Sequence, residues 1–224
     1  MEDECIGIAD RRSALVRSPY HGPMPRIFAL VFLVLIACWF ALALAGGVAA
    51  AAIFPAAREL ELSLAGYEEF IALRPTEGRM LVAGFLAESV FSFSNGIRLV
   101  VAPLSVVAFL ALGSMGGRTG LLSLRGLAIA VASLTLMGGV LWVQPEFSAR
   151  DREYRAAARA GDVDAAEALK SGVDLAHGRA STFASIEAIA LLVAIAASAG
   201  SGRRIGRGDS GTTSVPVGWG SRRG

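Results

Sequence analysis

Four long segments of this chain contain almost no charged residues, and they constrain its fold more than any other feature. Residues 27–57, 99–117 and 126–145 carry no charge, and residues 180–202 carry only Glu187. Each run reaches about the 20 residues that a helix needs to cross roughly 30 Å of hydrocarbon. Only 18% of the residues are charged, whereas a soluble domain has about a quarter. The sequence therefore predicts a multi-pass membrane protein.

We expect an all-α fold, an integral membrane four-helix bundle whose helices extend beyond the bilayer on one side. The predicted membrane spans are residues 27–53, 97–115, 124–143 and 179–200. These spans lie in a transmembrane domain of residues 27–200. A polar N-terminal tail, residues 1–26, precedes this domain, and a flexible, basic C-terminal tail, residues 201–224, follows it.

The first apolar run also has features of a cleaved signal peptide, and Met24 is an alternative start to Met1. The apolar core of a signal peptide is only about 7–15 residues long. This run continues to Ala57. We therefore expect an uncleaved membrane helix.

Helix-start and helix-stop residues predict the ends of the first two helices. Pro55 disfavours continuation of the first helix past residue 53, and Thr76 after Pro75 marks the start of the second. The apolar sequence from residue 80 to 117 is longer than a bilayer is thick, at about 1.5 Å per residue. Residues 77–97 are therefore predicted to stand in water, covered by protein.

Residues 144–176 are predicted to be an extramembrane connection made of two short polar helices. Ser148 starts the first of these helices, and Gly161 stops it. Asp162 caps the second helix, and Gly172 stops that one.

We expect both termini in the cytoplasm of a cell-membrane protein. A plain count of basic residues is close to even, with 11 of 21 on the side of the tails. The positive-inside rule acts near the span ends. The arginines at the ends on the tail side are Arg26, Arg118, Arg125, Arg203 and Arg204.

A polar face runs along the second helix. Glu88, Asn95 and Arg98 are spaced by seven and three residues, so they share one helical face. Glu187 falls at a depth comparable to that of Arg98, and a charge in hydrocarbon costs several kcal/mol, so the two are predicted to pair. The polar face has two interpretations: an ion-pair lock between helices, or a pathway or pocket for an ion or polar ligand.

His177 belongs to the same predicted intrabundle cluster, at the start of the fourth helix. The only other histidine is His21, in the tail expected on the opposite side, and a metal or haem site needs several ligands. No catalytic motif accompanies it. We therefore predict no metal site, no cofactor and no enzymatic activity.

Three sequence segments give the chain a resemblance to a known family: "GGVAAAAIFPAAREL", "AGFLAESVFSFSNGIRLV" and "DLAHGRASTFASIEAIALLVAI". Over residues 27–200 it resembles the transmembrane protein 205-like family, a multi-pass domain of unknown function. That family is similar to copper-resistance-D-like four-helix membrane proteins, so the resemblance implies metal or haem handling as an alternative. Glu187 departs from the neutral polar residue that the resemblance implies at its position.

Three functional hypotheses follow. The first is a non-enzymatic bundle with a structural or partner-binding role. The second is a small transporter or ion-conducting protein that uses the polar face, and the third is a haem- or copper-handling protein that uses His177. The expected partners are the lipid bilayer and either a second copy of the chain or another membrane protein. A net charge of +2 gives no reason to expect nucleic acid.

Overall fold

The computed structural model describes residues 24–60, 62–115 and 123–203, and every element in this part of the chain is a helix. The predicted all-α four-helix bundle is therefore confirmed. In chain order the elements are α2 (Met24–Glu59), α3 (Glu68–Leu73), α4 (Pro75–Ser114), α5 (Leu124–Gly138), η2 (Gly139–Val143), α6 (Gln144–Arg159) and α7 (Val163–Arg203).

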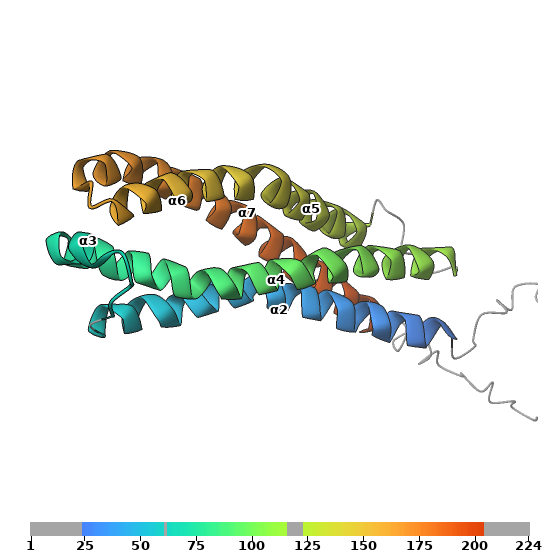
Figure 1. Cartoon of the computed structure of the whole chain (residues 1–224). Coiled ribbons are helices and arrows are strands. Elements are labelled where there is room, and N and C mark those ends of the chain that lie inside the picture. The colour runs from blue at the N-terminus through green and yellow to red at the C-terminus, as the bar shows by residue number, and fades with distance from the viewer. Residues whose placement is uncertain (1–23, 61, 116–122, 204–224) are drawn as a thin grey trace, which may run out of the picture.

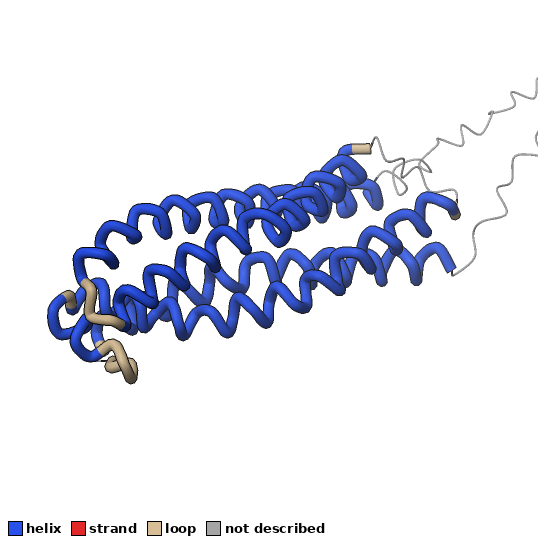
Figure 2. The backbone as a smooth tube through the Cα atoms, turned by 45° about the horizontal axis from the view of Figure 1, so that its top comes forward, coloured by secondary structure: helices blue, strands red, loops and turns tan. Residues whose placement is uncertain are grey.

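The long helices form two antiparallel pairs (Figure 1). α2 packs along α4, and the continuous rod formed by α5, η2 and α6 packs along α7. The pairs join mainly through α2 and α7, whereas α4 and α5 meet at few positions. Figure 2 shows the same arrangement from another side, with the loops of the described residues gathered almost entirely at one end. The bundle is thus closed along one seam and more open along the other.

α2 is longer than predicted, because it passes through Pro55 and ends at Glu59. A proline inside a helix removes one backbone donor. In this case the end of the helix is held from outside: Arg79 Nη1 of α4 donates a hydrogen bond to the carbonyl oxygen of Arg58 at 2.9 Å. Contact with α4 therefore stabilises the turn that the sequence alone disfavours.

α4 begins at Pro75, next to the predicted Thr76, and runs unbroken for 40 residues, or about 60 Å at 1.5 Å per residue. A helix of this length exceeds the thickness of a bilayer, so part of it must extend beyond one. That residues 77–97 are this part stays a prediction.

The connection between the third and fourth spans differs from the two separate short helices that were predicted. α6 continues directly from α5 through the π-helical turn η2, so Ser148 lies inside a helix instead of starting one. Gly161 does end that helix, with φ at +72°, and Asp162 Oδ1 accepts a hydrogen bond from Ala165 N at 3.0 Å. These two predictions are confirmed.

Gly172 was wrongly predicted to stop a helix, because α7 runs through it as one helix of 41 residues. A Cβ atom at this position would lie 2.8 Å from Nη1 of Arg150 on α6, so the glycine leaves room for that side chain. Glycine is common at helix stops and also occurs beside a neighbouring side chain inside a helix, so the sequence does not distinguish the two.

Buried side chains form two separate cores. The larger lies among α2, α4, α5 and α7 in the half of the bundle near the described ends of the chain, and includes Phe32, Trp39 and Leu191. The smaller lies at the opposite end, around Tyr67 and Phe70. We call this opposite end, residues 46–90 and 144–179, the head.

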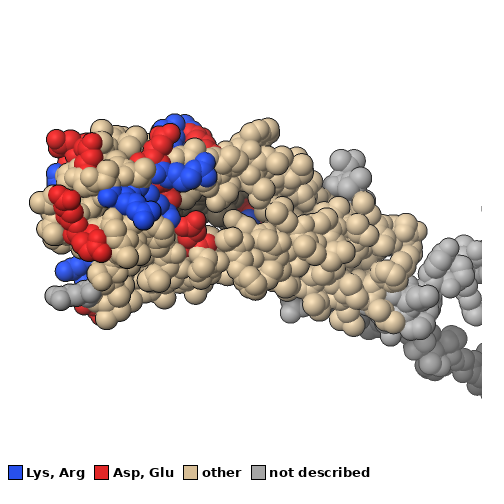
Figure 3. All heavy atoms as spheres, in the orientation of Figure 1, with Lys and Arg blue, Asp and Glu red and all other residues tan. Residues whose placement is uncertain are grey.

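The head carries the charges and the other half carries almost none (Figure 3). Within the described residues, four helices are long and apolar enough to cross a membrane. Phe93 and Trp142 are 71% and 75% exposed near the boundary between the charged and the apolar half, and aromatic side chains are common at such boundaries in membrane proteins. From Trp142 the rod runs about 27 Å to Leu124 on one side and about 25 Å to Arg159 on the other. The protein is a multi-pass membrane protein with a helical head.

The described ends of the chain, at Met24 and Arg203, lie at the same end of the bundle, as four spans require. We expect reporter fusions after Gly117 and after Lys170 to report opposite sides of the membrane. Enzymatic reporters active on one side only, placed at both points in the full-length gene, measure this. If both fusions report the same side, the four-span topology is wrong.

Candidate functional site

A buried carboxylate links three helices in the membrane half of the bundle. Glu187 of α7 is 1% exposed. Its Oε1 accepts a hydrogen bond from Nε1 of Trp39 on α2 at 2.7 Å, and its Oε2 forms an ion pair with Nη2 of Arg98 on α4. Arg98 Nη1 donates to Oδ1 of Asn95 at 2.9 Å. We call these four residues the polar cluster.

Helical periodicity and side-chain length explain why these residues meet. Asn95 and Arg98 are three residues apart on α4, which places them on one face. α4 and α7 have little direct backbone contact, so the long arginine side chain spans the gap between them. Trp39 is completely buried against α7, and its indole N–H needs an acceptor in an apolar surrounding.

In the polar cluster both carboxylate oxygens of Glu187 have a hydrogen-bond partner, whereas the guanidinium of Arg98 has partners for only some of its N–H groups. Both oxygens of Glu187 have partners, whereas Nε of Arg98 is buried without an acceptor among the described residues. Desolvating two charges costs several kcal/mol per ion, and their attraction offsets this only with good geometry and further hydrogen bonds. The arrangement therefore makes each charge dependent on the other.

The structure brings together three of the five residues predicted to form an intrabundle cluster. The predicted pairing of Arg98 with Glu187 is present, and Asn95 joins it. Glu88 and His177 lie elsewhere. Glu88 is ten positions before Arg98 on α4, about 15 Å along the helix axis. Its side chain is 61% exposed and pairs with Nη1 of Arg155 at 2.7 Å.

His177 lies on the exposed side of α7 in the head, where its ring centroid is 6.0 Å from that of Phe147. On α7, His177 shares a helical face with Ser181 and Ser185. That face points away from the bundle, since both serines are exposed as well.

Sequence reasoning missed Trp39. A usable signal was present: an indole near the middle of a charge-free span is a hydrogen-bond donor that hydrocarbon cannot satisfy.

A second polar network lies in the head, outside the membrane. Arg155 of α6 has its guanidinium carbon 3.9 Å from the ring centroid of Phe85 on α4, and its Nε lies 2.6 Å from Oδ2 of Asp151. Burial raises the pKa of Asp151, and the charge of Arg155 partly opposes this shift. Arg155 thereby links α6 to α4 on the open side of the bundle.

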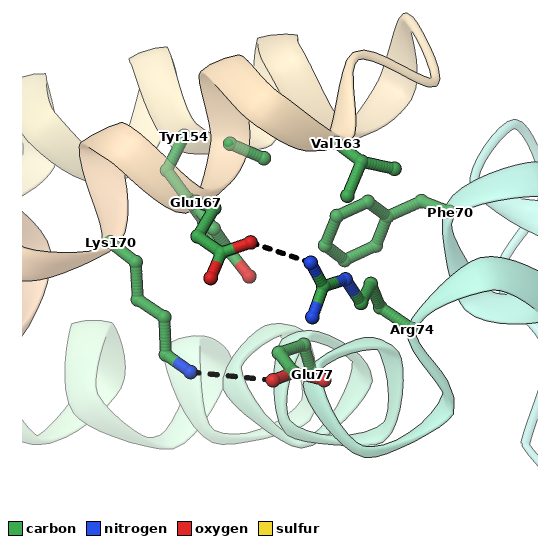
Figure 4. A pocket seen from close by; sticks show the side chains of 8 residues that line it. Phe70, Arg74, Glu77, Tyr154, Val163, Glu167 and Lys170 are labelled. Carbon is green, nitrogen blue, oxygen red and sulfur yellow. Dashed lines mark hydrogen bonds and ion pairs between the residues drawn. The ribbon is translucent and has the colours of Figure 1, made fainter.

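Two further ion pairs cross the tip of the head (Figure 4). Arg74 Nη2 lies 2.5 Å from Oε2 of Glu167, and Lys170 Nζ lies 3.6 Å from Oε1 of Glu77. The crevice between them has a volume of about 30 Å³ and is also lined by Phe70 and Tyr154. It has room for about one water molecule and none for a larger ligand.

A larger groove, about 310 Å³ in volume, opens between α4 and α5 in the membrane half. Apart from one hydroxyl its walls are apolar, formed by residues that include Val106, Phe109, Leu110, Ile129, Ala130 and Leu134. The hydroxyl belongs to Ser133 and is already used, because it donates to the carbonyl oxygen of Ile129 at 2.9 Å.

Metal ligands do not gather in the described part of the chain, where no three His, Cys, Asp or Glu side chains could hold an ion together. The fold and the polar cluster define an all-α, multi-pass membrane bundle with an ion pair between its helices. In comparisons with known proteins, no family, no curated protein and no solved structure matches the chain.

Proposed function

We propose that this protein is a non-enzymatic membrane bundle with a structural or partner-binding role, holding its helical head outside a cell membrane with both termini in the cytoplasm. The main support is the environment of Glu187. This residue is 1% exposed, and its two carboxylate oxygens accept hydrogen bonds from Trp39 of α2 and Arg98 of α4. An ion-binding carboxylate needs a free oxygen facing a wet path, so these contacts favour a lock.

The partner-binding part of the proposal rests on the head. The head is large, about 25 Å tall at 1.5 Å per residue, and its described ion pairs link its own helices. Several apolar side chains nevertheless remain exposed on it, including Leu60 at 54%, Leu73 at 59% and Leu175 at 57%. A second copy of the chain or another membrane protein is a suitable partner for such surfaces.

A second candidate function is that of a small transporter or ion-conducting protein that uses the polar cluster. Two observations favour it. The Arg98 side chain keeps 12% of its surface exposed, and a hollow with basic atoms in it is visible between the two helix pairs (Figure 3). A pathway must continue from Arg98 towards the other side of the membrane, past Ala102 and Ser105.

Cysteine labelling at Ser105 distinguishes the two functions. Ser105 is fully buried, about 10 Å deeper than Arg98 along α4. With Cys5 and Cys38 changed to serine, we expect Ser105→Cys in proteoliposomes to resist a charged, membrane-impermeant thiol reagent, because a dry lock admits no water. Ser171→Cys, on the exposed surface of the head, is the matched positive control. Labelling of Ser105→Cys at the rate of the control would support a water-filled pathway and contradict the lock.

A third candidate, a haem- or copper-handling protein, derives from the resemblance to copper-resistance-D-like membrane proteins. It requires His177 as a ligand. We expect the purified protein to show no Soret band and no stoichiometric copper, because His177 stands on the surface of the head without the companion ligands that such a site needs, as far as the described residues extend. Visible absorbance and metal analysis test this directly. Bound haem or copper that is lost in His177→Ala would refute it.

A further inference from the structure

We propose that Arg125 and the groove between α4 and α5 bind one anionic phospholipid, with the phosphate at Arg125 and an acyl chain in the groove. The site lies in the membrane half of the bundle, at the end opposite the head, and is separate from the polar cluster.

The groove requires an apolar occupant. Its volume is about 310 Å³, against about 30 Å³ for the crevice at the tip of the head. The hydroxyl of Ser133, the single one among the described residues of its wall, is bonded within its own helix. A polar ligand would find no partners in it, whereas a hydrocarbon chain needs none.

Arg125 supplies a cation beside this groove. The guanidinium carbon lies 6.0 Å from the ring centroid of Phe32 on α2, and that ring packs 5.9 Å from the ring of Phe109, which forms part of the groove wall. The next residue after Arg125, Gly126, also lines the groove. Arg125 thus lies beside the groove, connected to its wall through Phe32 and Phe109 and through its neighbour Gly126.

Arg125 also lacks an anion within the described part of the chain. Its Nε is buried without a hydrogen-bond acceptor there, and none of the described carboxylates forms an ion pair with it. The comparison with Arg98 is direct, because Arg98 is equally placed in the membrane half but has Glu187 as its partner. A partly buried guanidinium at the membrane surface favours a phosphate, which it can bind with two parallel hydrogen bonds.

The start of α5 adds to this preference. Arg125 lies in the first turn of the helix, where N–H groups precede the first intrahelical bond and favour negative charge. Ser123 Oγ accepts one of these N–H groups, that of Gly126. A phospholipid satisfies the cation, the helix end and the groove together, whereas a free phosphate ion would leave the groove empty.

The test is a lipid titration of the purified full-length protein in neutral detergent, followed by native mass spectrometry. The probes are phosphatidylglycerol and phosphatidylcholine with identical acyl chains. We expect the intact protein to bind one phosphatidylglycerol about tenfold more tightly than phosphatidylcholine, the factor that one charge-assisted hydrogen-bonded contact typically supplies. Arg125→Gln should abolish this difference.

Arg152→Gln is the matched control, because Arg152 is an exposed arginine of the head and its replacement removes the same charge. It should keep the preference for phosphatidylglycerol. Unchanged preference in Arg125→Gln would overturn the proposal, and so would an equal loss in both variants, which would show attraction by overall charge alone.

Two further measurements keep the test decisive if Arg125→Gln does not fold. Ala130→Phe fills the groove from its exposed side and should weaken phosphatidylglycerol binding about tenfold. Arg125→Lys keeps the charge but loses the paired hydrogen bonds, so it should keep only part of the preference. Glycerol 3-phosphate, a headgroup without chains, should not compete with the lipid. Full binding by Ala130→Phe, or competition by glycerol 3-phosphate at the concentrations at which the lipid binds, would overturn the acyl-chain site.

Discussion

Replacement of Glu187 by leucine is expected to lower the free energy of unfolding by about 3–5 kcal/mol, because it leaves the guanidinium of Arg98 in the membrane half without an anion. Arg98→Leu should cost a similar amount by leaving the carboxylate unpaired. The double replacement should cost clearly less than the two single losses added together, since it leaves neither charge behind. Unfolding of the purified protein in mixed detergent micelles measures all three.

Glu88→Leu is the matched control for this prediction. Glu88 also pairs with an arginine, but its side chain is 61% exposed, and Arg155 keeps Asp151 as a second partner. Exposed ion pairs contribute about 0–1 kcal/mol. Strictly additive losses in the Arg98 and Glu187 double replacement would contradict the coupling. So would a loss at Glu88 as large as that at Glu187.

Replacement of Gly46 by valine is expected to lower the free energy of unfolding by about 1–3 kcal/mol, because it overpacks the contact between α2 and α4. A Cβ atom at Gly46 would lie only 2.3 Å from Cε1 of Phe91, and therefore the ring or the helix must move. The same unfolding experiment measures this loss.

Gly47, the next residue, provides the control. A Cβ atom there has no other atom of the described residues within 4 Å, and so Gly47→Val should change stability by less than about 0.5 kcal/mol. Equal effects at the two positions would show that helix propensity, and not the close approach of α2 and α4, determines the outcome.

The sequence was sufficient for the helical architecture because the signal comes from the solvent. A hydrocarbon layer excludes charged side chains from about 20 consecutive residues, and this requirement holds however the helices pack against one another. The pairing of Arg98 with Glu187 was predictable for a related reason: an uncompensated charge in a span is costly, and Glu187 is the carboxylate predicted at the depth of Arg98.

Helix ends in the head were harder to predict, because the residue types that start or stop helices also occur inside helices. Gly161 ends a helix with a positive φ, whereas Gly172 lies inside a helix and leaves room for the side chain of Arg150. Ser148 has the pattern of a helix start, yet the π-helical turn η2 joins α5 to α6 without a break. Tertiary contacts decide between these roles, and a single sequence does not contain them.

The residues that accompany Arg98 and Glu187 also depended on tertiary structure. His177 shared a helical face with residues near Glu187, but the orientation of α7 turns that face outward. Trp39 came from a helix far away in sequence, and its role required knowing that α2 lies between α4 and α7 at this depth.

The two helix pairs are joined by ion pairs in two different environments, and this gives the bundle a graded response to ionic strength. At about 0.15 M salt the Debye length is roughly 8 Å, so mobile ions weaken exposed pairs such as Arg74–Glu167 and Lys170–Glu77, whereas they do not enter the hydrocarbon around Arg98 and Glu187. Rising salt therefore weakens the ion pairs of the head before it affects the pair in the membrane half. The apolar core around Phe70, which includes Ala158 and Ala166 from the other helix pair, does not depend on salt in this way and still joins the two pairs.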